Sequence, residues 1–445
     1  MNSRLITIYS DRQTQVPKLT NDEKGDILAL KDLLGSQYIL LQANDSLQIM
    51  HYVGFIARGK TRLQILPKIY ADHGKISAEE EKSESVLLLL RLLSYSGYLG
   101  YKEIPDPQSI ESCDNDLFEI FIGIFVNRFL DVFIRNLHRS YEVYEENKQF
   151  IKGKILFHET ILKNSLRKDR HYIRYDEFTI NTLLNRIFKT VLLRLLSQTV
   201  LSENKKKLNL ALNHLEEVEP IDLYRGIFDK VIFNRMNIIY QPILLMAKLL
   251  YTNRQPGFSG GDENTFTFLV PLNKLFEYYA YKLIDNYSQK SAFRVRYQGP
   301  EKYLALHKGE RHFPLKPDIT IFHHNEILYI IDAKFKNPFD GLEHIDLKSP
   351  DIYQIVTYAV CYQCENVFLL YPRFKGQLMR DTELANYNMQ TKTGSINLRI
   401  LQIDIMQTDN DKTQKQLVES IFSVNNCEAV QQSASENLME SLSRS

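Results

Sequence analysis

The sequence has only four cysteines, no long uninterrupted hydrophobic run and no excess of charge of either sign. Apolar stretches such as residues 86–90 soon meet a charged residue, here Arg91, so no membrane-spanning helix is predicted. The beginning of the chain lacks the apolar segment of a secretory signal, and we expect a cytoplasmic protein. The cysteines are too few for a disulfide scaffold. Cys361 and Cys364 have zinc-type spacing, but without a second pair a half-buried position on a helix is the better interpretation.

The charge balance also limits the partners. The chain has 55 Lys and Arg residues and 54 Asp and Glu residues, a net charge of +1, so a nucleic acid would have to be bound by a local basic patch. With 445 residues the chain suggests roughly two to three domains. Hydrophobic residues make up 44% and charged residues 24%, which is typical of globular proteins and excludes wholesale disorder.

One motif suggests a nucleotide site. Residues 54–61, GFIARGKT, match the phosphate-binding pattern G-x-x-x-x-G-K-[ST]. In NTPases this loop opens a helix whose N-terminus favours the phosphate. Here the residues on both sides alternate in polarity like strands, so residues 58–60 are predicted to form the tip of a β-hairpin. We therefore expect no nucleotide site in this segment.

The pattern of apolar residues divides the chain into four regions and predicts an α+β multidomain fold. Residues 1–72 show short alternating runs, which indicate a small β-rich domain. A polar linker from Asp72 to Ser85 leads into the second region, residues 73–264, which continues with helical periodicity. Residues 265–407 read as a compact α/β domain with a mixed sheet flanked by helices. Residues 408–445 are polar and weakly patterned, and we expect a disordered tail.

Two groups of basic residues lie in the helical region. The run from Lys205 to Lys207 is interpreted as a solvated helix face. The longer group surrounds a predicted hairpin and is interleaved with tyrosines, which makes it a candidate phosphate-contacting surface. Its members are Lys148, Lys152, Lys154, Lys163, Arg167, Lys168, Arg170 and Arg174, with Tyr141, Tyr144, Tyr172 and Tyr175.

The residues most informative about chemistry lie in a second predicted hairpin, residues 317–336. Asp332 and Lys334 are two apart on one strand and therefore share a face. If the turn is centred on Asn325, Asp318 lies opposite Asp332, with Cβ atoms about 5 Å apart. A buried, unpaired carboxylate is costly, so the two acids need a counter-charge. Mg²⁺ would supply it, with Lys334 near one of its water ligands. A structural salt bridge of an acid with Lys334 or Lys336 is the alternative.

Two predicted helices flank this hairpin. Glu277 lies beside the apolar stripe of the first helix, where it can reach inward at a sheet edge. The second helix has a favourable start at Ser349, with Ser349 as the cap and a proline in the first turn. On that helix Gln354 and Tyr358 are four residues apart and share one face.

The order of these features resembles the PD-(D/E)xK nuclease core. That order is an acid on a helix, Asp318 after a proline, the run Asp332-Ala333-Lys334, and then a helix with a glutamine. Further segments resemble the McrC family over most of the chain. They are VGFI at residues 53–56, LQILPKI at 63–69, KGKI at 152–155, DEF at 176–178, NRIF at 185–188, NKLFE at 273–277, DIYQ at 351–354 and YA at 358–359.

The resemblance implies the nuclease subunit of a modification-dependent restriction complex that cuts double-stranded DNA. In that family the partner, McrB, is a GTP-hydrolysing AAA+ ring that reads methylated cytosine, and the amino-terminal part of McrC docks in the ring and stimulates its GTPase. GTP would therefore be bound by the partner and not by this chain. Some relatives serve site-specific restriction systems, so dependence on methylcytosine is a separate question from nuclease chemistry.

The resemblance also suggests roles for the site residues. Asp318 and Asp332 would hold Mg²⁺ with the Ala333 carbonyl, and Glu277 would bind a water of the metal or a second cation. Lys334 would position the attacking water and stabilise the developing charge. Gln354, supported by Tyr358, would fix the lysine or a phosphate. The alternatives are a non-catalytic adaptor that regulates an AAA+ partner and an RNA-targeting nuclease with the same core.

Overall fold

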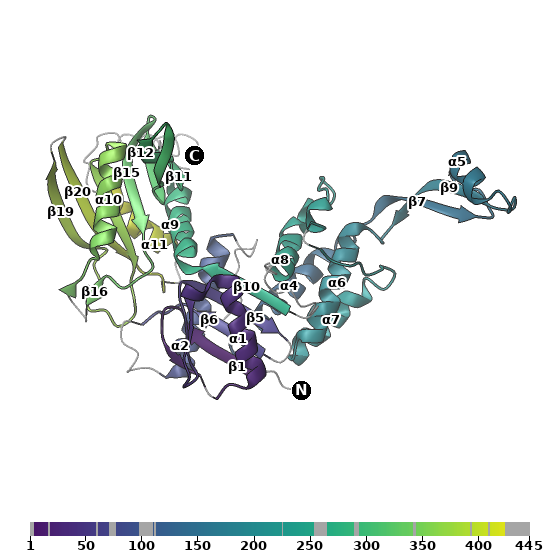
Figure 1. Cartoon of the computed structure of the whole chain (residues 1–445), viewed down its shortest axis with the longest axis horizontal. Coiled ribbons are helices and arrows are strands. Elements are labelled where there is room, and N and C mark those ends of the chain that lie inside the picture. The colour runs from purple at the N-terminus through teal and green to yellow at the C-terminus, as the bar shows by residue number, and fades with distance from the viewer. Residues whose placement is uncertain are drawn as a thin grey trace, which may run out of the picture.

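In the computed structural model the chain forms three parts: a sheet-containing N-terminal part, a helical middle part with a long arm, and a C-terminal part built on a second sheet (Figure 1). The structure describes residues 4–16, 18–58, 61–70, 77–97, 110, 113–224, 226–252, 265–288, 293–340, 344–391, 394–407 and 410–422. No helix within these ranges is long and apolar enough to cross a membrane. The α+β multidomain class predicted from the sequence is confirmed.

The N-terminal part is built on a four-stranded sheet with the strand order β1-β6-β5-β10. β5 (Tyr52–Arg58) and β6 (Thr61–Leu66) pair in antiparallel register, which confirms the predicted hairpin over the GFIARGKT segment. The tip of this hairpin, residues 59–60, lies outside the described residues. β1 (Arg4–Tyr9) completes this side of the sheet and runs parallel to β6.

The N-terminal part also contains a helix that the sequence analysis did not predict. α1 (Asn21–Leu34) begins with a capping box, in which the Thr20 hydroxyl accepts from the Glu23 amide and the Glu23 carboxylate accepts from the Thr20 amide. Its apolar residues pack into a core shared with β1, β5 and β6. A small sheet in the order β2-β4-β3 adjoins it. The bounds are β2 (Thr14–Gln15), η1 (Ser36–Tyr38), β3 (Ile39–Leu41) and β4 (Ser46–Ile49).

The fourth strand of the first sheet comes from far along the chain. β10 (Thr265–Pro271) pairs antiparallel with β5, and Phe268 lies opposite Phe55. At Gly54 the φ angle is +133°, and a Cβ atom would lie 1.9 Å from the carbonyl oxygen of Phe268, so only glycine permits this approach. The region predicted to form the third domain therefore begins as a strand of the N-terminal sheet.

The middle part is mostly helical, as predicted. Its central helix, α4 (Leu117–Phe133), begins at Asp116, whose side chain accepts from the amides of residues 118 and 119. The polar stretch predicted as a linker is helical from Ala78 onward, because Ser77 caps α2 and glutamates in its first turn favour the helix dipole. The remaining bounds are α2 (Ala78–Tyr95), α6 (Leu183–Gln198), α7 (Ser202–Asn213), η3 (Phe228–Lys230), η4 (Ile238–Tyr240) and α8 (Gln241–Thr252).

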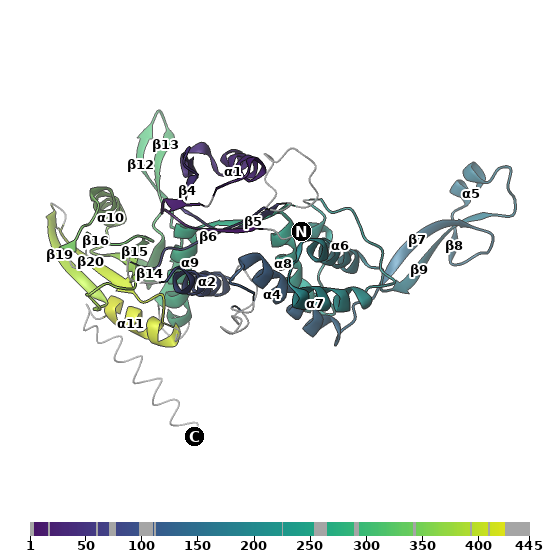
Figure 2. The same ribbon diagram turned by 90° about the horizontal axis from the view of Figure 1, so that it is seen from below.

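A long arm projects from the middle part, away from both sheets (Figures 1 and 2). β7 (Ser140–Lys148) and β9 (His171–Thr179) pair antiparallel along their whole length, which confirms the hairpin predicted around the basic group. β8 (Lys154–Ile155) and α5 (Phe157–Lys163) lie at its far end. The arm also exposes apolar side chains there, namely Phe150, Ile151, Phe157, Ile161, Leu162 and Leu166.

The C-terminal part contains a six-stranded mixed sheet in the order β11-β14-β15-β18-β20-β19. α10 (Ser349–Tyr362) covers one face, and α9 (Leu272–Ser288) and α11 (Asn410–Phe422) cover the other (Figure 2). The bounds of the strands are β11 (Phe293–Tyr297), β12 (Lys302–His307), β13 (Glu310–Leu315), β14 (Ile319–His323), β15 (Glu326–Ala333), β16 (Phe339–Asp340), β17 (His344–Ile345), β18 (Asn366–Pro372), β19 (Glu383–Thr391) and β20 (Gly394–Ile403).

Helix α11 corrects the prediction of a disordered tail from residue 408. Leu417 and Ile421 are fully buried in the core shared with α9, so residues 410–422 are part of the fold. Their four apolar residues, all in the second half of the helix, gave too weak a periodic signal. The rest of the predicted tail, residues 423–445, lies outside the described residues.

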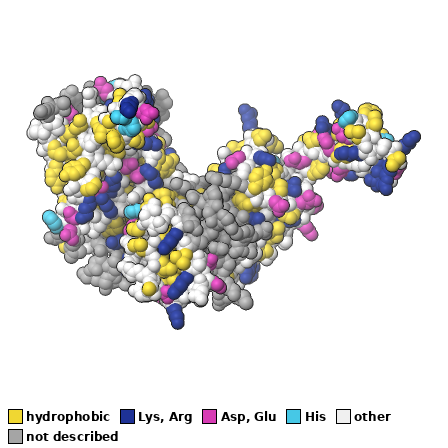
Figure 3. Space-filling model, in the orientation of Figure 1, with side chains coloured by type: hydrophobic (Ala, Val, Ile, Leu, Met, Phe, Trp, Pro, Cys, Tyr) yellow, Lys and Arg dark blue, Asp and Glu magenta, His cyan; other side chains and the backbone are white. Residues whose placement is uncertain are grey.

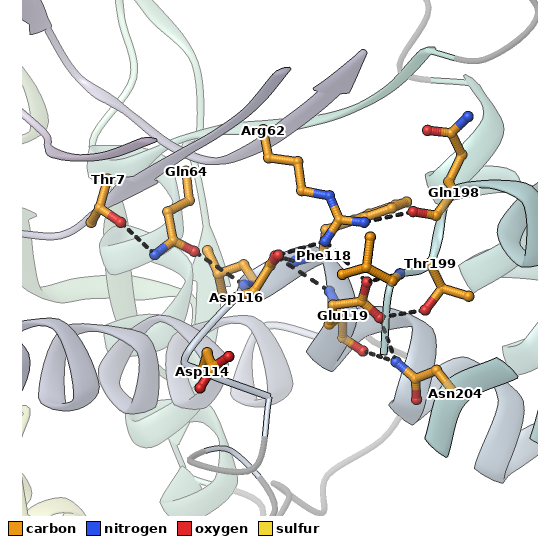
Figure 4. Close-up of polar contacts among 12 residues, drawn as sticks. Thr7, Arg62, Gln64, Asp114, Asp116, Phe118, Glu119, Gln198, Thr199 and Asn204 are labelled. Atoms are coloured by element: carbon orange, nitrogen blue, oxygen red, sulfur yellow. Dashed lines mark hydrogen bonds and ion pairs between the residues drawn. The ribbon is translucent and has the colours of Figure 1, made fainter. Parts of the chain in front are cut away.

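A buried polar network joins the N-terminal sheet to the middle helices (Figure 4). Arg62 on β6 donates to Asp116 at 2.7 Å, to Glu119 at 3.0 Å and to the backbone carbonyl of Gln198 at 2.6 Å. The arginine and both acids are less than a tenth exposed. Further donors complete the coordination of the Glu119 carboxylate, namely the Thr199 hydroxyl, the Val200 amide and the Asn204 amide group.

Replacing Arg62 by alanine should therefore destabilise the protein strongly. The variant would leave two carboxylates buried without their cation, a loss of about 3–5 kcal/mol. The apparent free energy of unfolding from denaturant titration would measure it. Lys415→Ala on α11 is the control, because its ion pair with Glu419 is exposed and such pairs contribute at most about 1 kcal/mol. Equal losses in the two variants would contradict this account of the network.

Candidate active site

The strand register brings the two predicted acids together. Ile319 on β14 pairs with Ile331 on β15, so Asp318 and Asp332, the next residues outward, lie opposite each other at the end of the hairpin. Apolar residues on both strands fix this register, because Ile331 faces α9 whereas Ile330 faces α10. Asp332 is 1% exposed and Asp318 is 8% exposed. The structure thus places both carboxylates at a buried sheet edge, as the sequence analysis expected.

Lys334 lies beside this acid pair. Its Nζ atom is 2.7 Å from Oδ2 of Asp332, and its backbone amide donates to the carbonyl of Leu370 on the neighbouring β18. The amide of Ala333 donates to Oδ2 of Asp318 at 3.0 Å. The salt bridge proposed as the alternative therefore exists between Asp332 and Lys334. Lys336 does not share it, because it pairs with Asp351 instead.

Helix α10 supplies the polar support predicted for the lysine. The ammonium of Lys334 donates to Oε1 of Gln354 at 3.0 Å, and Nε2 of Gln354 donates to the Tyr358 hydroxyl at 2.9 Å. The Tyr358 hydroxyl in turn donates to the carbonyl of Lys316 at 3.4 Å. A continuous chain of hydrogen bonds thus holds the lysine in place. The predicted cap at Ser349 is wrong by one residue, since Lys348 is the N-cap and Ser349 is the first helical residue.

Glu277 reaches the site from the opposite face of the sheet. It is buried on α9, and its carboxylate lies 2.7 Å from Nζ of Lys274, one turn earlier on the same helix. Lys274 was not predicted as a site residue, although its spacing of three residues from Glu277 is that of a helical ion pair. The two ammonium groups, of Lys334 and Lys274, therefore flank the three acids.

The acids repel one another strongly in this position. Burial, followed by the charges of Asp332 and Glu277, raises the pKa of Asp318 to about 9. For Lys334, burial acts to lower the pKa, but the adjacent Asp332 outweighs it and the pKa is raised. The lysine thus stays charged at neutral pH, whereas Asp318 keeps its proton there when no cation is bound, because the proton relieves the repulsion among the acids.

A divalent cation would take the place of that proton and neutralise the acid pair in its ionised form. Oδ2 of Asp332 is buried and has no hydrogen-bond partner other than its ion pair with Lys334. No group of three or more Asp, Glu, His or Cys side chains in the described part of the chain is arranged to enclose a metal by itself. The site offers a carboxylate pair, and Mg²⁺ suits such a partial set because it keeps several water ligands.

A cavity adjoins the site on the α9 side. It has a volume of about 600 Å³ and is bordered by Lys274, Tyr278, Tyr297 and Gln298, together with the two residues that follow α2 and the last residue of β10. The Gln298 amide donates to the carbonyl of Asp318 at 2.7 Å, so the cavity wall is joined directly to the acid pair. The aromatic residues of this wall were not predicted, because they come from two elements that only the fold brings together.

Other sequence signals lie away from the site. Cys361 is half-buried on α10, as predicted, whereas Cys364 is buried and lies just after the end of the helix. The basic group of the arm is far from the C-terminal sheet (Figure 1). Several of its members pair with acids of the same arm, such as Arg174 with Glu145 and Lys152 with Glu177.

The fold and the site define a multidomain α+β protein with a buried carboxylate pair and a lysine at the edge of a mixed sheet. A family model described as McrBC 5-methylcytosine restriction system component matches residues 47–372, which include all the site residues described above. The match covers well over half of the chain, and the protein belongs to this family. The resemblance indicated by the sequence motifs is confirmed.

Solved structures support the fold. The chain is similar, with a TM-score of 0.69 and 20% identity, to a chain of a refined half-complex from a tetradecameric assembly of Thermococcus gammatolerans McrB AAA+ hexamers with bound McrC. The alignment covers 94% of this chain and 100% of the other. A cryo-EM structure of the Thermococcus gammatolerans McrBC complex gives a TM-score of 0.45 at 24% identity over 63% of this chain and 87% of that chain, and supports no further argument. No curated protein matches significantly.

The crowding of the acids predicts a pH-dependent gain of stability in Asp318→Asn. The folded state raises the pKa of Asp318 from 3.8 to about 9, so its contribution to stability is complete below pH 3.8 and is lost as the pH rises toward 9. Asparagine has no such titration and can still accept from Ala333. In metal-free buffer we expect the variant to be more stable than the parent by roughly 1–3 kcal/mol at pH 8 and equal to it near pH 4.

Thermal unfolding in EDTA between these pH values would measure the difference. Asp318→Ala is the control, since it removes the charge and also the acceptor for the Ala333 amide. A gain in Asp318→Asn that did not change with pH would contradict the proposed origin in carboxylate repulsion.

Proposed function

We propose that this protein is the Mg²⁺-dependent DNA endonuclease subunit of a McrBC-type restriction complex, with a PD-(D/E)xK active site. The observation that carries the proposal is the arrangement of Asp318, Asp332 and Lys334 at one sheet edge. Membership of the McrBC family supports it independently. The order of elements, a helix with an acid, two strands with the aspartates and a helix with a glutamine, matches the order expected for this nuclease core.

The chain's own residues suit phosphodiester hydrolysis. Asp318 and Asp332, with the Ala333 carbonyl, would hold Mg²⁺, and Glu277 would bind one of its waters. The ion, when bound, supplies positive charge to the phosphate and lowers the pKa of a coordinated water. Lys334 is held by Gln354 at a position where its ammonium can orient the attacking water and stabilise charge on the phosphate oxygens. Tyr358 fixes the orientation of Gln354.

The partner in this proposal is a GTP-hydrolysing McrB-like AAA+ hexamer, whose GTPase this chain would stimulate. The similar structure from Thermococcus gammatolerans contains McrB AAA+ hexamers with bound McrC, and its fold covers nearly all of this chain. The described residues on both sides of positions 59–60 pair as strands of a hairpin, which is consistent with GTP being bound by the partner. Recognition of methylcytosine or of a specific sequence would also belong to the partner.

The alternative function is a non-catalytic adaptor that regulates the AAA+ partner. The ion pair between Asp332 and Lys334 favours it, because the pair partly neutralises the site without a metal. Under this alternative the acids are structural, and the exposed apolar end of the arm would account for the interaction with the partner. The two functions differ in what the carboxylates do: the proposed nuclease needs them for DNA cleavage, whereas the adaptor would cleave no DNA.

Substitutions at the acid pair distinguish the two functions. Asp332→Ala and Lys334→Ala should each lower the rate of plasmid cleavage by at least about 10²–10³-fold, because each removes charge stabilisation at the reacting phosphate. Tyr358→Phe should lower it by about 10–100-fold, since it loosens only the support of Gln354. The assay contains Mg²⁺, GTP and the partner, with methylated and unmodified DNA, and EDTA should stop cleavage.

The GTPase of the partner serves as the internal control and should be stimulated equally by all variants. If the parent protein never cuts DNA while GTPase stimulation persists, the adaptor function is correct. Cleavage of RNA in place of DNA would assign the same chemistry to a different substrate.

A further inference from the structure

A two-stranded ribbon beside the candidate active site has no role in the proposed chemistry. β12 and β13 pair only with each other and project from the C-terminal sheet on the side covered by α10 (Figure 2). Both faces of the ribbon are exposed, and Leu304, Leu306 and Phe313 are 53%, 73% and 67% exposed. In the isolated molecule the projecting position leaves these apolar side chains in contact with water, which indicates that the ribbon contacts another molecule.

The ribbon and its surroundings are basic. Residues 302–315 contain three Lys and Arg residues and one acid. The neighbouring edge strand, β11, adds Arg294 and Arg296, which pair with Phe322 and Thr320 of β14. Thr320 lies opposite Ile330, which packs in the core under α10. The two arginines therefore lie on the sheet face that α10 covers. Within the described residues, Arg294, Arg296, Lys308, Arg311 and Lys316 are exposed and form no ion pair with an acid.

The same face carries the candidate active site. In Figure 3, Lys and Arg side chains gather near the lower ends of α10 and β15, and further basic and histidine side chains lie with apolar ones over the position of β12. Lys334, Gln354 and Tyr358 also lie between the sheet and α10. A polyanion placed on this face could therefore contact the ribbon and the acid pair together.

The root of the ribbon is fixed to the helix that supports the catalytic lysine. The Tyr362 hydroxyl lies within hydrogen-bond distance of the carbonyls of Pro300 and Leu315, one at each strand end. The ammonium of Lys302 donates to the carbonyl of Cys361 at 2.8 Å. One turn earlier on α10, Tyr358 contacts Lys316, two residues before Asp318. The ribbon is thus held at a fixed position relative to the acid pair.

We infer that the β12–β13 ribbon enters a groove of duplex DNA next to the phosphodiester at the acid pair. This inference rests on the proposed nuclease function. Strands of a ribbon are about 5 Å apart, and the major groove, about 12 Å wide, admits a two-stranded ribbon. Lys308 and Arg311 near the turn contact phosphates, and Phe313 makes an apolar contact inside the groove. The ribbon would position the duplex while the acid pair and Lys334 act on its backbone.

Duplex binding by the full-length chain in EDTA, where no cleavage occurs, tests the inference. Fluorescence anisotropy of a labelled duplex would be measured over a range of salt concentrations. In Lys308→Ala/Arg311→Ala we expect a dissociation constant about tenfold higher and a salt dependence reduced by about 1.8, the value for two lost phosphate contacts. Phe313→Ser should weaken binding without changing the salt dependence, because it removes no charge.

Lys205→Ala/Lys206→Ala on α7 is the matched control, since it removes two exposed lysines far from the ribbon (Figure 1). It should change neither the affinity nor the salt dependence. All these positions are exposed, and unchanged thermal unfolding would show that each variant folds. Equal effects in both double variants, or no effect in the ribbon variants, would overturn the inference.

Cleavage assays with the partner separate this inference from the proposed function. If the parent protein cuts DNA and the ribbon variants bind and cut as it does, the ribbon inference fails and the nuclease function stands. If the ribbon variants instead lose self-association by light scattering while retaining DNA affinity, the ribbon binds a second copy of the chain and the inference is wrong. If the parent neither binds nor cuts DNA, both proposals fail.

Discussion

The buried guanidinium of Arg62 is the interaction on which the arrangement of this molecule depends. It satisfies two carboxylates and a backbone carbonyl at once, and it also lies over the ring of Phe118, 5.2 Å from its centroid. These partners come from the start of α4 and the end of α6, so one side chain fixes the N-terminal sheet against two helices. Two buried acids and one arginine leave a negative charge, which donors from Thr199, Val200 and Asn204 stabilise.

That sheet in turn positions the candidate active site. β10 is its edge strand, and α9 begins at the residue after β10 ends, so the helix that carries Glu277 is anchored to the N-terminal part. The backbone hydrogen bond from Leu272 to His51 strengthens this junction. From α9 the same apolar core continues onto one face of the C-terminal sheet. The site that holds the acids is therefore joined to the N-terminal part through one continuous apolar core.

Several elements could not be predicted from the sequence, because their local patterns were weak or their partners are distant in the chain. In α1 and α11 the large apolar residues begin only at Ile27 and Leu417, so the periodic signals of both helices were weak. The Thr20 and Glu23 capping pair nevertheless marked the start of α1. The polar first turn of α2 resembled a linker because glutamates that favour a helix dipole also occur in flexible segments. The role of β10 could not be predicted, because its pairing with β5 joins residues more than two hundred positions apart.

The sequence by itself determined the chemistry available to this protein. Strand alternation placed Asp318 and Asp332 close together across the hairpin, and helical spacing put Gln354 and Tyr358 on one face, because both are local consequences of backbone geometry. The register shift between Ile321 and Phe322 sets Asp318 opposite Asp332. Only the tertiary structure decided how these groups meet. The packing of α10 aimed Gln354 at Lys334, and α9 brought Glu277 close enough to raise the pKa of Asp318. Such effects depend on distances between elements, which no local pattern encodes.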